Sequence, residues 1–302
     1  MAPVLEAKNL TKLIGERTIV DNASFNVAQG EVFGFLGPNG AGKTTTIRML
    51  VGLIRPTSGS VSICGFDVRR QFESAMRCIG CMVENPDLYR FMTGRENLEH
   101  FARMLGIRGE SEIHRVADLV SLDHRLDQRV GTYSLGMRQR LGIAQAMLGR
   151  PRLLILDEPA NGLDPAGIRE IRSLLGRLAH DEGLSVFISS HLLGEVEMMC
   201  DRIAIIHNGR IVREGPVADL ISIHREMEFR VGDPERARTI LASRGLTPRS
   251  EGDRLFVPME ESDTPPILAA FAENGIAIYH AQQKFQTLEE LFIETTGGET
   301  VG

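Results

Sequence analysis

The chain has 302 residues, a length that favours two domains, and its 42% hydrophobic and 25% charged residues exclude a disordered chain. The formal net charge of −6 arises entirely after residue 221, because residues 1–221 carry 26 basic and 26 acidic side chains whereas residues 222–302 carry 8 and 14. Neither part has the basic surface of a nucleic-acid binder, and no apolar run approaches the roughly 18 residues of a membrane helix, so we expect no nucleic-acid partner and a cytoplasmic location.

The N-terminal segment alternates short apolar stretches with turn residues. Residues 5–13 and 18–27 alternate apolar and polar positions, which predicts two strands joined by a turn. Residues 31–36, Glu-Val-Phe-Gly-Phe-Leu, predict a third and more buried strand, and residues 46–51 have the character of a helix.

Nine residues join that third strand to the helix, and they are Gly37, Pro38, Asn39, Gly40, Ala41, Gly42, Lys43, Thr44 and Thr45. They match the phosphate-binding pattern G-x-x-x-x-G-K-[ST], with the strand before and the helix after that this pattern needs. The glycines let backbone N–H groups converge on phosphate oxygens, and the helix N-terminus adds a favourable dipole. We expect Lys43 to reach the β- and γ-phosphates of a nucleotide and the Thr44 hydroxyl to ligate Mg²⁺.

The middle of the chain changes character. From about residue 85 to residue 150, apolar residues recur at helical spacing, which predicts a helical subdomain. Short apolar strands then return at residues 153–156, 186–189 and 203–207, in alternation with helices. This order is typical of an α/β domain that carries a mostly helical insertion.

The strand at residues 153–156 ends in two adjacent carboxylates, Asp157 and Glu158. About 110 residues after a phosphate-binding loop, this pair indicates a nucleotide-hydrolysing site. We expect Asp157 to face the Mg²⁺ side of the phosphates and Glu158 to accept a proton from an attacking water.

The pattern of strands and helices restarts after residue 220. The predicted elements are strands at 227–231, 254–259 and 276–281 and helices at 235–244, 266–273 and 288–294. Their order is close to β-α-β-β-α-β, which predicts a small α+β domain of the ferredoxin-like kind. We therefore divide the chain into domains at residues 1–221 and 222–302.

Three further motifs complete a family pattern, namely Tyr133-Ser-Leu-Gly-Met-Arg-Gln-Arg140, Gly162-Leu-Asp164 and Ser189-Ser-His191. With the phosphate-binding loop and the acidic pair, they resemble the nucleotide-binding subunit of ABC transporters over residues 4–220. The first motif resembles the family's signature L-S-G-G-Q, from which Leu135 and Met137 depart. The resemblance implies a P-loop NTPase core of the ABC type, in which two copies hold ATP between the loop of one and the signature of the other.

The resemblance also assigns roles to single residues. It implies that Ser134 and Gly136 bind the γ-phosphate held by a second copy, and that Asp164 links the two sites. It implies that His191 holds the γ-phosphate and Glu158 in catalytic register, so that Glu158, His191 and Lys43 form the catalytic set.

Two positions depart from the usual family pattern. Ile14 stands where the family often stacks an aromatic residue on adenine. Ile14 is therefore either a base contact or a core residue. If it is a base contact, the loss of stacking predicts weaker selection between ATP and GTP. Glu84 stands where the family usually has a glutamine that senses the γ-phosphate and Mg²⁺. With Pro86 and Tyr89, Glu84 is similar to the bacitracin and lantibiotic exporter branch, and neutral variation is the alternative.

The resemblance implies an ATP-hydrolysing subunit, with ATP and Mg²⁺, that powers a membrane exporter of antimicrobial peptides or drugs. Its partners would be a second copy of itself and a membrane-spanning permease. The permease would attach it to the inner face of the cell membrane. A short helix of the permease would lie in a groove built largely by residues 87–98. One alternative is a soluble ABC-type ATPase switch, although such chains typically carry two cassettes, a long coiled coil or zinc modules. Another is a scaffold that binds ATP without turnover, which the presence of Glu158 and His191 disfavours.

Overall fold

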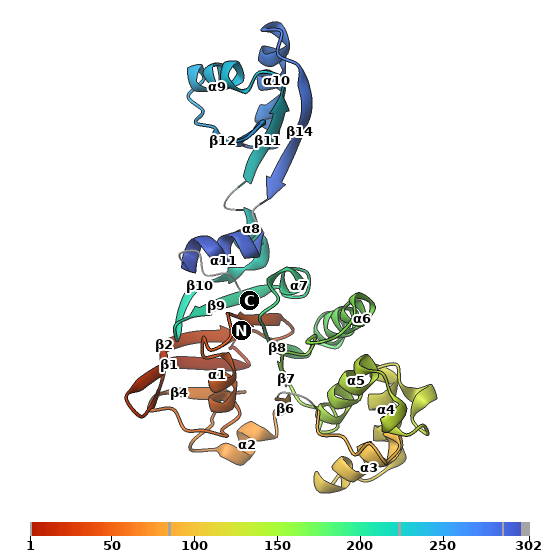
Figure 1. Cartoon of the computed structure of the whole chain (residues 1–302). Helices are drawn as coiled ribbons and strands as arrows, with labels where there is room; N and C mark the ends of the chain where they lie inside the picture. Colours follow the sequence, from red (N-terminus) through yellow and green to blue (C-terminus); the bar gives the residue numbers. More distant parts are fainter. Residues whose placement is uncertain (1, 84–85, 223–224, 286, 297–302) are drawn as a thin grey trace. The chain divides into compact units, whose positions relative to one another are not determined.

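The computed structural model describes residues 2–83, 86–222, 225–285 and 287–296. The chain divides into two compact units, an N-terminal unit that extends to Pro216 and a C-terminal unit that begins at Val217 (Figure 1). The domain boundary that the sequence places after residue 221 stays a prediction. Among the described residues, no helix combines the length and the apolar character that a membrane span needs.

A six-stranded sheet forms the centre of the N-terminal unit, in the order β10-β9-β3-β8-β7-β6. Its strands are β3 (Val32–Leu36), β6 (Ile79–Met82), β7 (Leu153–Asp157), β8 (Ser185–Ser190), β9 (Arg202–His207) and β10 (Arg210–Pro216). All neighbours are parallel except β10 and β9. Strands β3, β7 and β8 are buried along their whole length, which is why they appear in the sequence as continuous apolar runs. Because they run parallel, their carboxyl ends meet at one edge of the sheet.

A second, antiparallel sheet packs over the first and encloses the core. Its order is β2-β1-β4-β5, with β1 (Leu5–Ile14), β2 (Arg17–Val27), β4 (Ser58–Ile63) and β5 (Phe66–Asp67). Four phenylalanine rings at the centre of this core, whose neighbouring centroids lie 5.2–5.9 Å apart, are Phe25, Phe33, Phe35 and Phe187. Helix α1 (Lys43–Leu50) contributes its buried side chains to the same core, and α2 (Phe72–Met76) follows β5.

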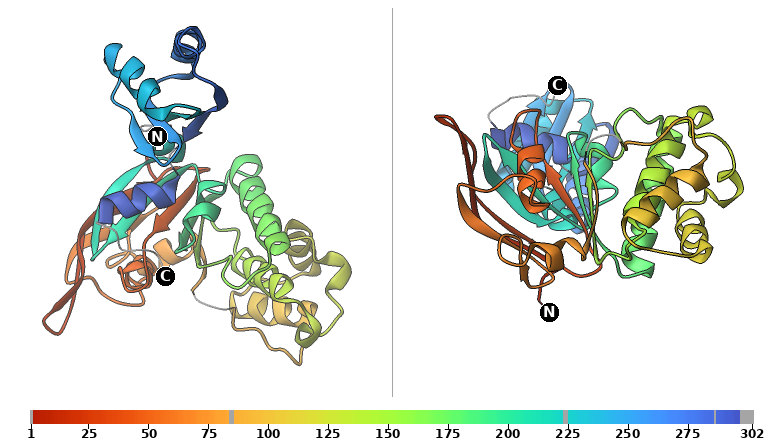
Figure 2. Two further views of the ribbon diagram at one scale, coloured as in Figure 1. Left: turned by 45° about the horizontal axis from the view of Figure 1, so that its top comes forward. Right: turned by 90° about the horizontal axis from the view of Figure 1, so that it is seen from below.

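The predicted helical insertion is present as a group of helices beside the two sheets (Figures 1 and 2). It contains α3 (Gly94–Met104), α4 (Glu110–Leu119), α5 (Leu135–Ala146) and two short 3-10 helices, Asp123–Arg125 and Val130–Thr132. Helix α3 begins with a capping box in which Thr93 and Glu96 satisfy each other's backbone N–H groups. The remaining helical elements are α6 (Pro165–Gly176), a π-helical turn (Arg177–Asp181) and α7 (Leu193–Glu197).

The C-terminal unit is a four-stranded antiparallel sheet, in the order β12-β13-β11-β14, with two helices connecting its strands. Its elements are α8 (Val217–Ser222), β11 (Arg225–Val231), α9 (Pro234–Ser243), β12 (Arg249–Glu251), β13 (Arg254–Pro258), a 3-10 turn (Glu261–Asp263), α10 (Thr264–Glu273), β14 (Ile278–Phe285) and α11 (Leu288–Thr296). The order β11-α9-β12-β13-α10-β14 is the β-α-β-β-α-β arrangement to which the predicted order is close. Two expectations need correction, because the last strand begins two residues later and ends four residues later than expected, and β12 was not predicted.

Candidate functional site

The phosphate-binding loop lies at the carboxyl end of β3 and is fixed by close packing of its glycines. A Cβ atom at Gly37 would collide with the backbone oxygen of Ile206 in β9, and one at Gly42 would lie 2.8 Å from the backbone oxygen of Ile19 in β2. Gly42 also has φ = 111°, a conformation that favours glycine, directly before α1 begins. Loops in this position, outside the carboxyl ends of parallel strands, are where open α/β sheets bind ligands.

Lys43 is the first residue of α1, and its ammonium group points back into the loop. Its Nζ atom donates to the backbone oxygen of Gly37 at 2.8 Å and lies 3.3 Å from Oε1 of Glu158. Only 6% of its side chain is exposed. The positive charge of Lys43 is thus held at the centre of the site, where it can neutralise phosphate oxygens.

The carboxylate of Asp157 lies at the end of β7, where it is 3% exposed. Burial raises the pKa of this carboxyl, while hydrogen bonds from the hydroxyls of Ser189 and Thr44 oppose the increase and the neighbouring charge of Glu158 adds to it. The Ser189 hydroxyl reaches Asp157 because β7 and β8 pair in parallel with these two residues opposite each other. Because burial disfavours the ionised carboxylate, a cation beside Asp157 would stabilise it.

Glu158 joins the lysine to the histidine that the sequence singles out. Its Oε2 atom lies 2.7 Å from Nδ1 of His191, while its Oε1 atom contacts Lys43. Glu158 has φ = 51°, a left-handed conformation that is uncommon for glutamate, and its backbone N–H donates to the Ser189 hydroxyl at 3.1 Å. This turn places the carboxylate beside Lys43 and His191. Backbone conformations of this uncommon kind often occur at functional sites.

Two residues at this site have no role in the sequence analysis. Ser189 contacts both acidic residues, since it donates to Asp157 and accepts from the Glu158 backbone. Glu195, in the first turn of α7, is half-buried, and burial raises the pKa of its carboxyl against the opposing charge of His191. His191 precedes α7, so no helical spacing in the sequence joins it to Glu195, and the sequence carries no clear signal for this residue.

The other predicted residues of the loop lie where the pattern places them. The backbone N–H of Ala41 donates to the Pro38 oxygen at 3.2 Å, and Gly40 has φ = 81°. Asn39 is exposed and Thr45 half-buried.

The structure gives Ser134, Gly136 and Asp164 positions on helices outside this cluster. Ser134 is the exposed N-cap of α5, where its hydroxyl accepts from the Met137 backbone at 3.2 Å. Gly136 lies in the first turn of α5, beside Leu163. Asp164 is the N-cap of α6 and accepts from the Gly167 backbone at 2.9 Å. No hydrogen bond or ion pair between described residues joins these three to Lys43, Glu158 or His191. Their roles toward a second copy stay predictions.

The two unusual positions have different outcomes. Ile14 lies at the end of β1 and is 58% exposed, so the reading of Ile14 as a core residue is wrong. Its role as a base contact stays a prediction. Glu84 lies outside the described residues, and its predicted contacts stay predictions too.

Comparison with known proteins places this site in a family. The family model described as "ABC transporter" matches residues 20–161. The chain is 48% identical to YhcH, an uncharacterised ABC transporter ATP-binding protein of Bacillus subtilis (strain 168), over 98% of this chain and 97% of that protein. The chain belongs to the ABC transporter ATP-binding proteins. As a member of this family, it is an ATPase that binds ATP.

Two further similarities show which parts of this ABC ATPase resemble known proteins. It is 41% identical to the bacitracin transport ATP-binding protein BcrA of Bacillus licheniformis, over 100% of both chains. A solved ATP-binding subunit of an ABC transporter superposes with a TM-score of 0.63 at 33% identity, over 72% of this chain and 91% of that one. The likeness to BcrA therefore includes the C-terminal unit as well as the catalytic one.

Proposed function

We propose that this ABC ATPase is the ATP-hydrolysing subunit of a membrane exporter, and that two copies close around two ATP molecules and reopen after hydrolysis. The observation that carries the proposal is the chain of contacts from Lys43 through Glu158 to His191 at the end of a phosphate-binding loop. A scaffold that binds ATP without turnover needs no half-buried carboxylate held between a lysine and a histidine. This arrangement supports hydrolysis because phosphoryl transfer depends mainly on positioning and on charge neutralisation.

In this proposal, each residue of the cluster performs a separate task. Lys43 and the backbone N–H groups of the loop neutralise the phosphate oxygens. Glu158 accepts the proton of the attacking water, and His191 holds the Glu158 carboxylate in place through the 2.7 Å contact. Ser134 and Gly136 of the second copy would complete the site, with Asp164 linking the two sites across the dimer.

The residues around Asp157 fit a magnesium ion. The buried Asp157 carboxylate and the Thr44 hydroxyl are oxygen donors of the kind that Mg²⁺ prefers. In the described part of the chain, no group of three or more histidine, cysteine or acidic side chains could hold a metal by itself. Mg²⁺ usually binds in this manner, through one or two protein oxygens together with phosphates. When bound, it would neutralise phosphate charge, and Glu84 would lie near it in the proposed arrangement.

An exposed aromatic surface supports a permease partner. Tyr89 and Phe91 are 40% and 71% exposed, and their rings pack against each other at 5.8 Å. His100 and Phe101 of α3 pack against Tyr89 at 5.1 and 6.3 Å. Apolar side chains gathered on a surface indicate a protein-binding site. Tyr89 and Phe91 belong to residues 87–98, the segment expected to build the groove for a permease helix, and His100 and Phe101 follow it directly. Docking there would place the ATPase at the inner face of the cell membrane.

The proposed cargo is an antimicrobial peptide or drug. It rests on the full-length similarity to a bacitracin transport protein and on the choice of glutamate at position 84. The alternative function, a soluble ATPase switch, has neither of these in its favour.

Co-purification with a polytopic membrane protein from the native host tests the proposal. We expect the wild-type chain and the Tyr279→Glu variant, which alters an equally exposed aromatic residue of the C-terminal unit, to co-purify with the permease. Phe91→Glu should lose the permease and keep the ATPase activity of the isolated subunit. If no membrane protein is retained, or if Phe91→Glu retains it as well as the wild type does, the soluble switch becomes the better assignment.

A further inference from the structure

A pair of cysteines, Cys64 and Cys78, lies away from the nucleotide site in the N-terminal unit. Cys64 directly follows β4, and Cys78 directly precedes β6. Strand β6 pairs in parallel with β7 from Ile79 and Leu153 onward, so Cys78 lies at the amino ends of these strands, whereas Asp157 lies at the carboxyl end of β7. A site formed by the two cysteines therefore shares no residue with the nucleotide site.

The thiol groups of Cys64 and Cys78 contact each other. The Cys78 thiol donates to the backbone oxygen of Ser74 at 3.4 Å, which leaves its sulfur to accept the hydrogen bond from the Cys64 thiol. The backbone N–H of Arg152 donates to the Cys78 oxygen at 2.9 Å, and the charge of the same arginine acts on Cys64, so a third residue places the two cysteines together. Both are half-buried against one apolar core.

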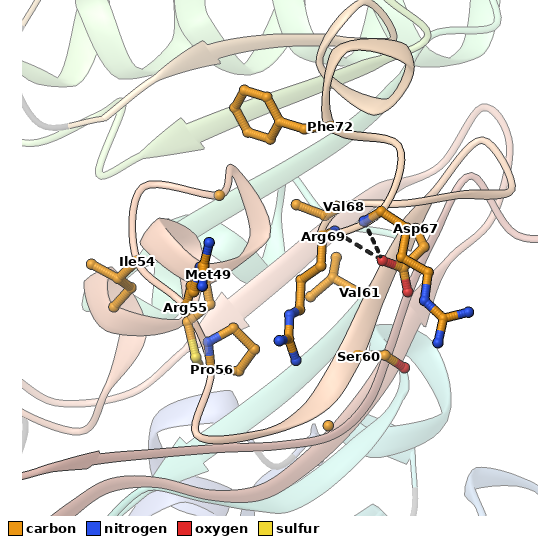
Figure 3. Close-up of a pocket in the computed structure, with 13 residues that line it drawn as sticks. Met49, Ile54, Arg55, Pro56, Ser60, Val61, Asp67, Val68, Arg69 and Phe72 are labelled. Carbon is orange, nitrogen blue, oxygen red and sulfur yellow. Dashed lines mark hydrogen bonds between the residues drawn. The ribbon is translucent and has the colours of Figure 1, made fainter.

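Local turns return the chain from the first cysteine to the second. Cys64 and Gly65, with φ = 51° and 84°, form the two-residue turn between β4 and β5. After β5, the Asp67 carboxylate accepts from the backbone N–H groups of Arg69 and Arg70 at 2.9 Å each, as Figure 3 shows. This second turn leads into α2, which ends two residues before the second cysteine. Hydrogen-bonded structure thus holds the whole connection in place.

Neither of the other two cysteines can take the place of Cys64 or Cys78. Cys81 is exposed and lies three residues after Cys78 along β6, which is roughly 10 Å in a strand. Cys200 is 8% exposed, and a Cβ atom at Gly34 in β3 would lie 2.8 Å from its sulfur, so it is packed against the central sheet. The geometry therefore selects one pair of thiols.

The surroundings also order the reactivity of the two thiols. Burial, together with the hydrogen bond to Cys78, raises the pKa of the Cys64 thiol to about 11, while the charge of Arg152 opposes the increase. The thiolate is the form that attacks an oxidant, so Cys64, which is protonated at neutral pH, is a poor first nucleophile. We therefore expect Cys78 to react first and Cys64 to attack second.

We propose that Cys64 and Cys78 form a redox modification site, at which hydrogen peroxide oxidises the two thiols to an intrachain disulfide. The Cys78 thiolate attacks one peroxide oxygen, the O–O bond breaks and hydroxide leaves, which gives a sulfenic acid. The Cys64 sulfur then attacks the Cys78 sulfur, and the hydroxyl group leaves with the Cys64 proton as water. Peroxide is thereby reduced to water, and a dithiol such as dithiothreitol reverses the oxidation of the pair.

Oxidation of the full chain, followed by alkylation of the remaining thiols and mass spectrometry, tests the proposal. At a low molar excess of peroxide, the wild type should lose two alkylatable thiols and two hydrogens, and dithiothreitol should restore both thiols. Cys78→Ser should form at least about tenfold less of the cross-link. Cys81→Ser is the matched control, because the tryptic peptide that contains Cys78 also contains Cys81, and it should form the cross-link like the wild type.

A second variant, Cys64→Asn, keeps the test independent of how Cys78→Ser folds. Asparagine suits the left-handed turn at position 64, so this variant should fold. Without the second thiol, its Cys78 should stay a sulfenic acid that dimedone labels at least about tenfold more than in the wild type.

Two outcomes overturn the site. One is a wild-type chain that keeps Cys64 and Cys78 reduced while Cys81 is oxidised. The other is a cross-link that forms in Cys78→Ser to the same extent as in the wild type. The reduced variants should hydrolyse ATP like the wild type, so a negative result here leaves the proposed function untouched.

Discussion

Glu158 is the residue on which turnover should depend most strongly. The change Glu158→Gln keeps the shape of the side chain and removes the charge that faces Lys43 and His191. We expect hydrolysis to fall by about 10²–10⁴-fold, the usual contribution of a general base, while ATP still binds. Phosphate release at saturating ATP and Mg²⁺ measures the loss, and size-exclusion chromatography with ATP should show dimers that accumulate.

The control for this change is Glu182→Gln, which neutralises an exposed glutamate of the same unit. It should hydrolyse ATP at the wild-type rate. Retention of half the wild-type turnover by Glu158→Gln would assign the proton transfer to another residue.

Replacing Asp157 should raise the stability of the fold while it abolishes activity. Burial raises the pKa of the Asp157 carboxyl, so the ionised form lowers the free energy of unfolding. This loss of stability is fully present above the raised pKa. It disappears as the pH falls below about 3.9, the ordinary pKa of an aspartate. Asp157→Asn should therefore raise the Tm at neutral pH, by about 2–4 °C if the gain is near 1 kcal/mol. The gain should shrink as the pH is lowered toward that range, and hydrolysis should be lost.

Thermal unfolding without nucleotide, recorded from neutral to mildly acidic pH, measures this effect. Asp181→Asn, an exposed position, should leave the Tm unchanged. A lower Tm for Asp157→Asn at neutral pH would mean that the hydrogen bonds from Ser189 and Thr44 outweigh burial.

The sequence predicts the residues of the site better than their contacts. Lys43, Asp157 and Glu158 could be placed together from the phosphate-binding loop and the strand that ends in the acidic pair, because parallel strands bring their carboxyl ends to one edge. His191 was added to them only by the family resemblance. The double contact of Ser189 could not be predicted, since it depends on the register that sets Ser189 opposite Asp157, a pairing between residues distant in sequence. The exposure of Ile14 depends on where the hairpin ends, which alternation alone does not fix.

At the scale of elements, two helix N-termini allow a structural role to be separated from a catalytic one. Thr93 caps α3 and Ser134 caps α5, each through one hydroxyl that accepts from a backbone N–H. Thr93→Ala and Ser134→Ala should each cost about 1 kcal/mol of stability. Only Ser134→Ala should lower hydrolysis as well, because only that hydroxyl is proposed to reach the nucleotide of a second copy.

Thermal unfolding and phosphate release on the two variants, at a temperature where both are folded, make this comparison. Equal activity in both variants would limit Ser134 to capping. A loss of activity in both would show that helix stability alone controls turnover.

The elements that the sequence predicts well are those with continuous apolar runs or strong helical spacing. Strands β3, β7 and β8 are of this kind, since both of their faces are buried. Strand β14 was predicted too short because Gln282, Gln283 and Lys284 interrupt the apolar pattern, although pairing with β11 continues as far as Phe285. Strand β12 has three exposed residues and is held by pairing with β13, so it has no apolar pattern to read.

At the scale of the whole molecule, the two units should separate. Chains that end at Pro216 or at Ile221 should fold and bind ATP within about threefold of the full chain, because each unit has its own apolar core. A chain that ends at Asp201 is the control, since it lacks β9 and β10 and leaves β3 unpaired on one side. That control should be insoluble.

Circular dichroism and fluorescent-nucleotide binding measure these chains. If the chains ending at Pro216 and Ile221 are as insoluble as the control, the two units share one cooperative core, and the division into domains is wrong.

The packing of the phosphate-binding loop has a consequence for how such a chain could change through descent. Gly37 is pressed against β9 and Gly42 against β2, so both glycines are required by the fold before any phosphate is bound. Lys43 is required for a different reason, because its ammonium group contacts groups of the site itself, namely the Gly37 oxygen and the Glu158 carboxylate. In a lineage that abandoned ATP, substitutions should therefore accumulate first at Lys43 and Glu158. The two glycines would persist as a relic of the lost activity, so their presence alone is poor evidence that a descendant still hydrolyses nucleotide.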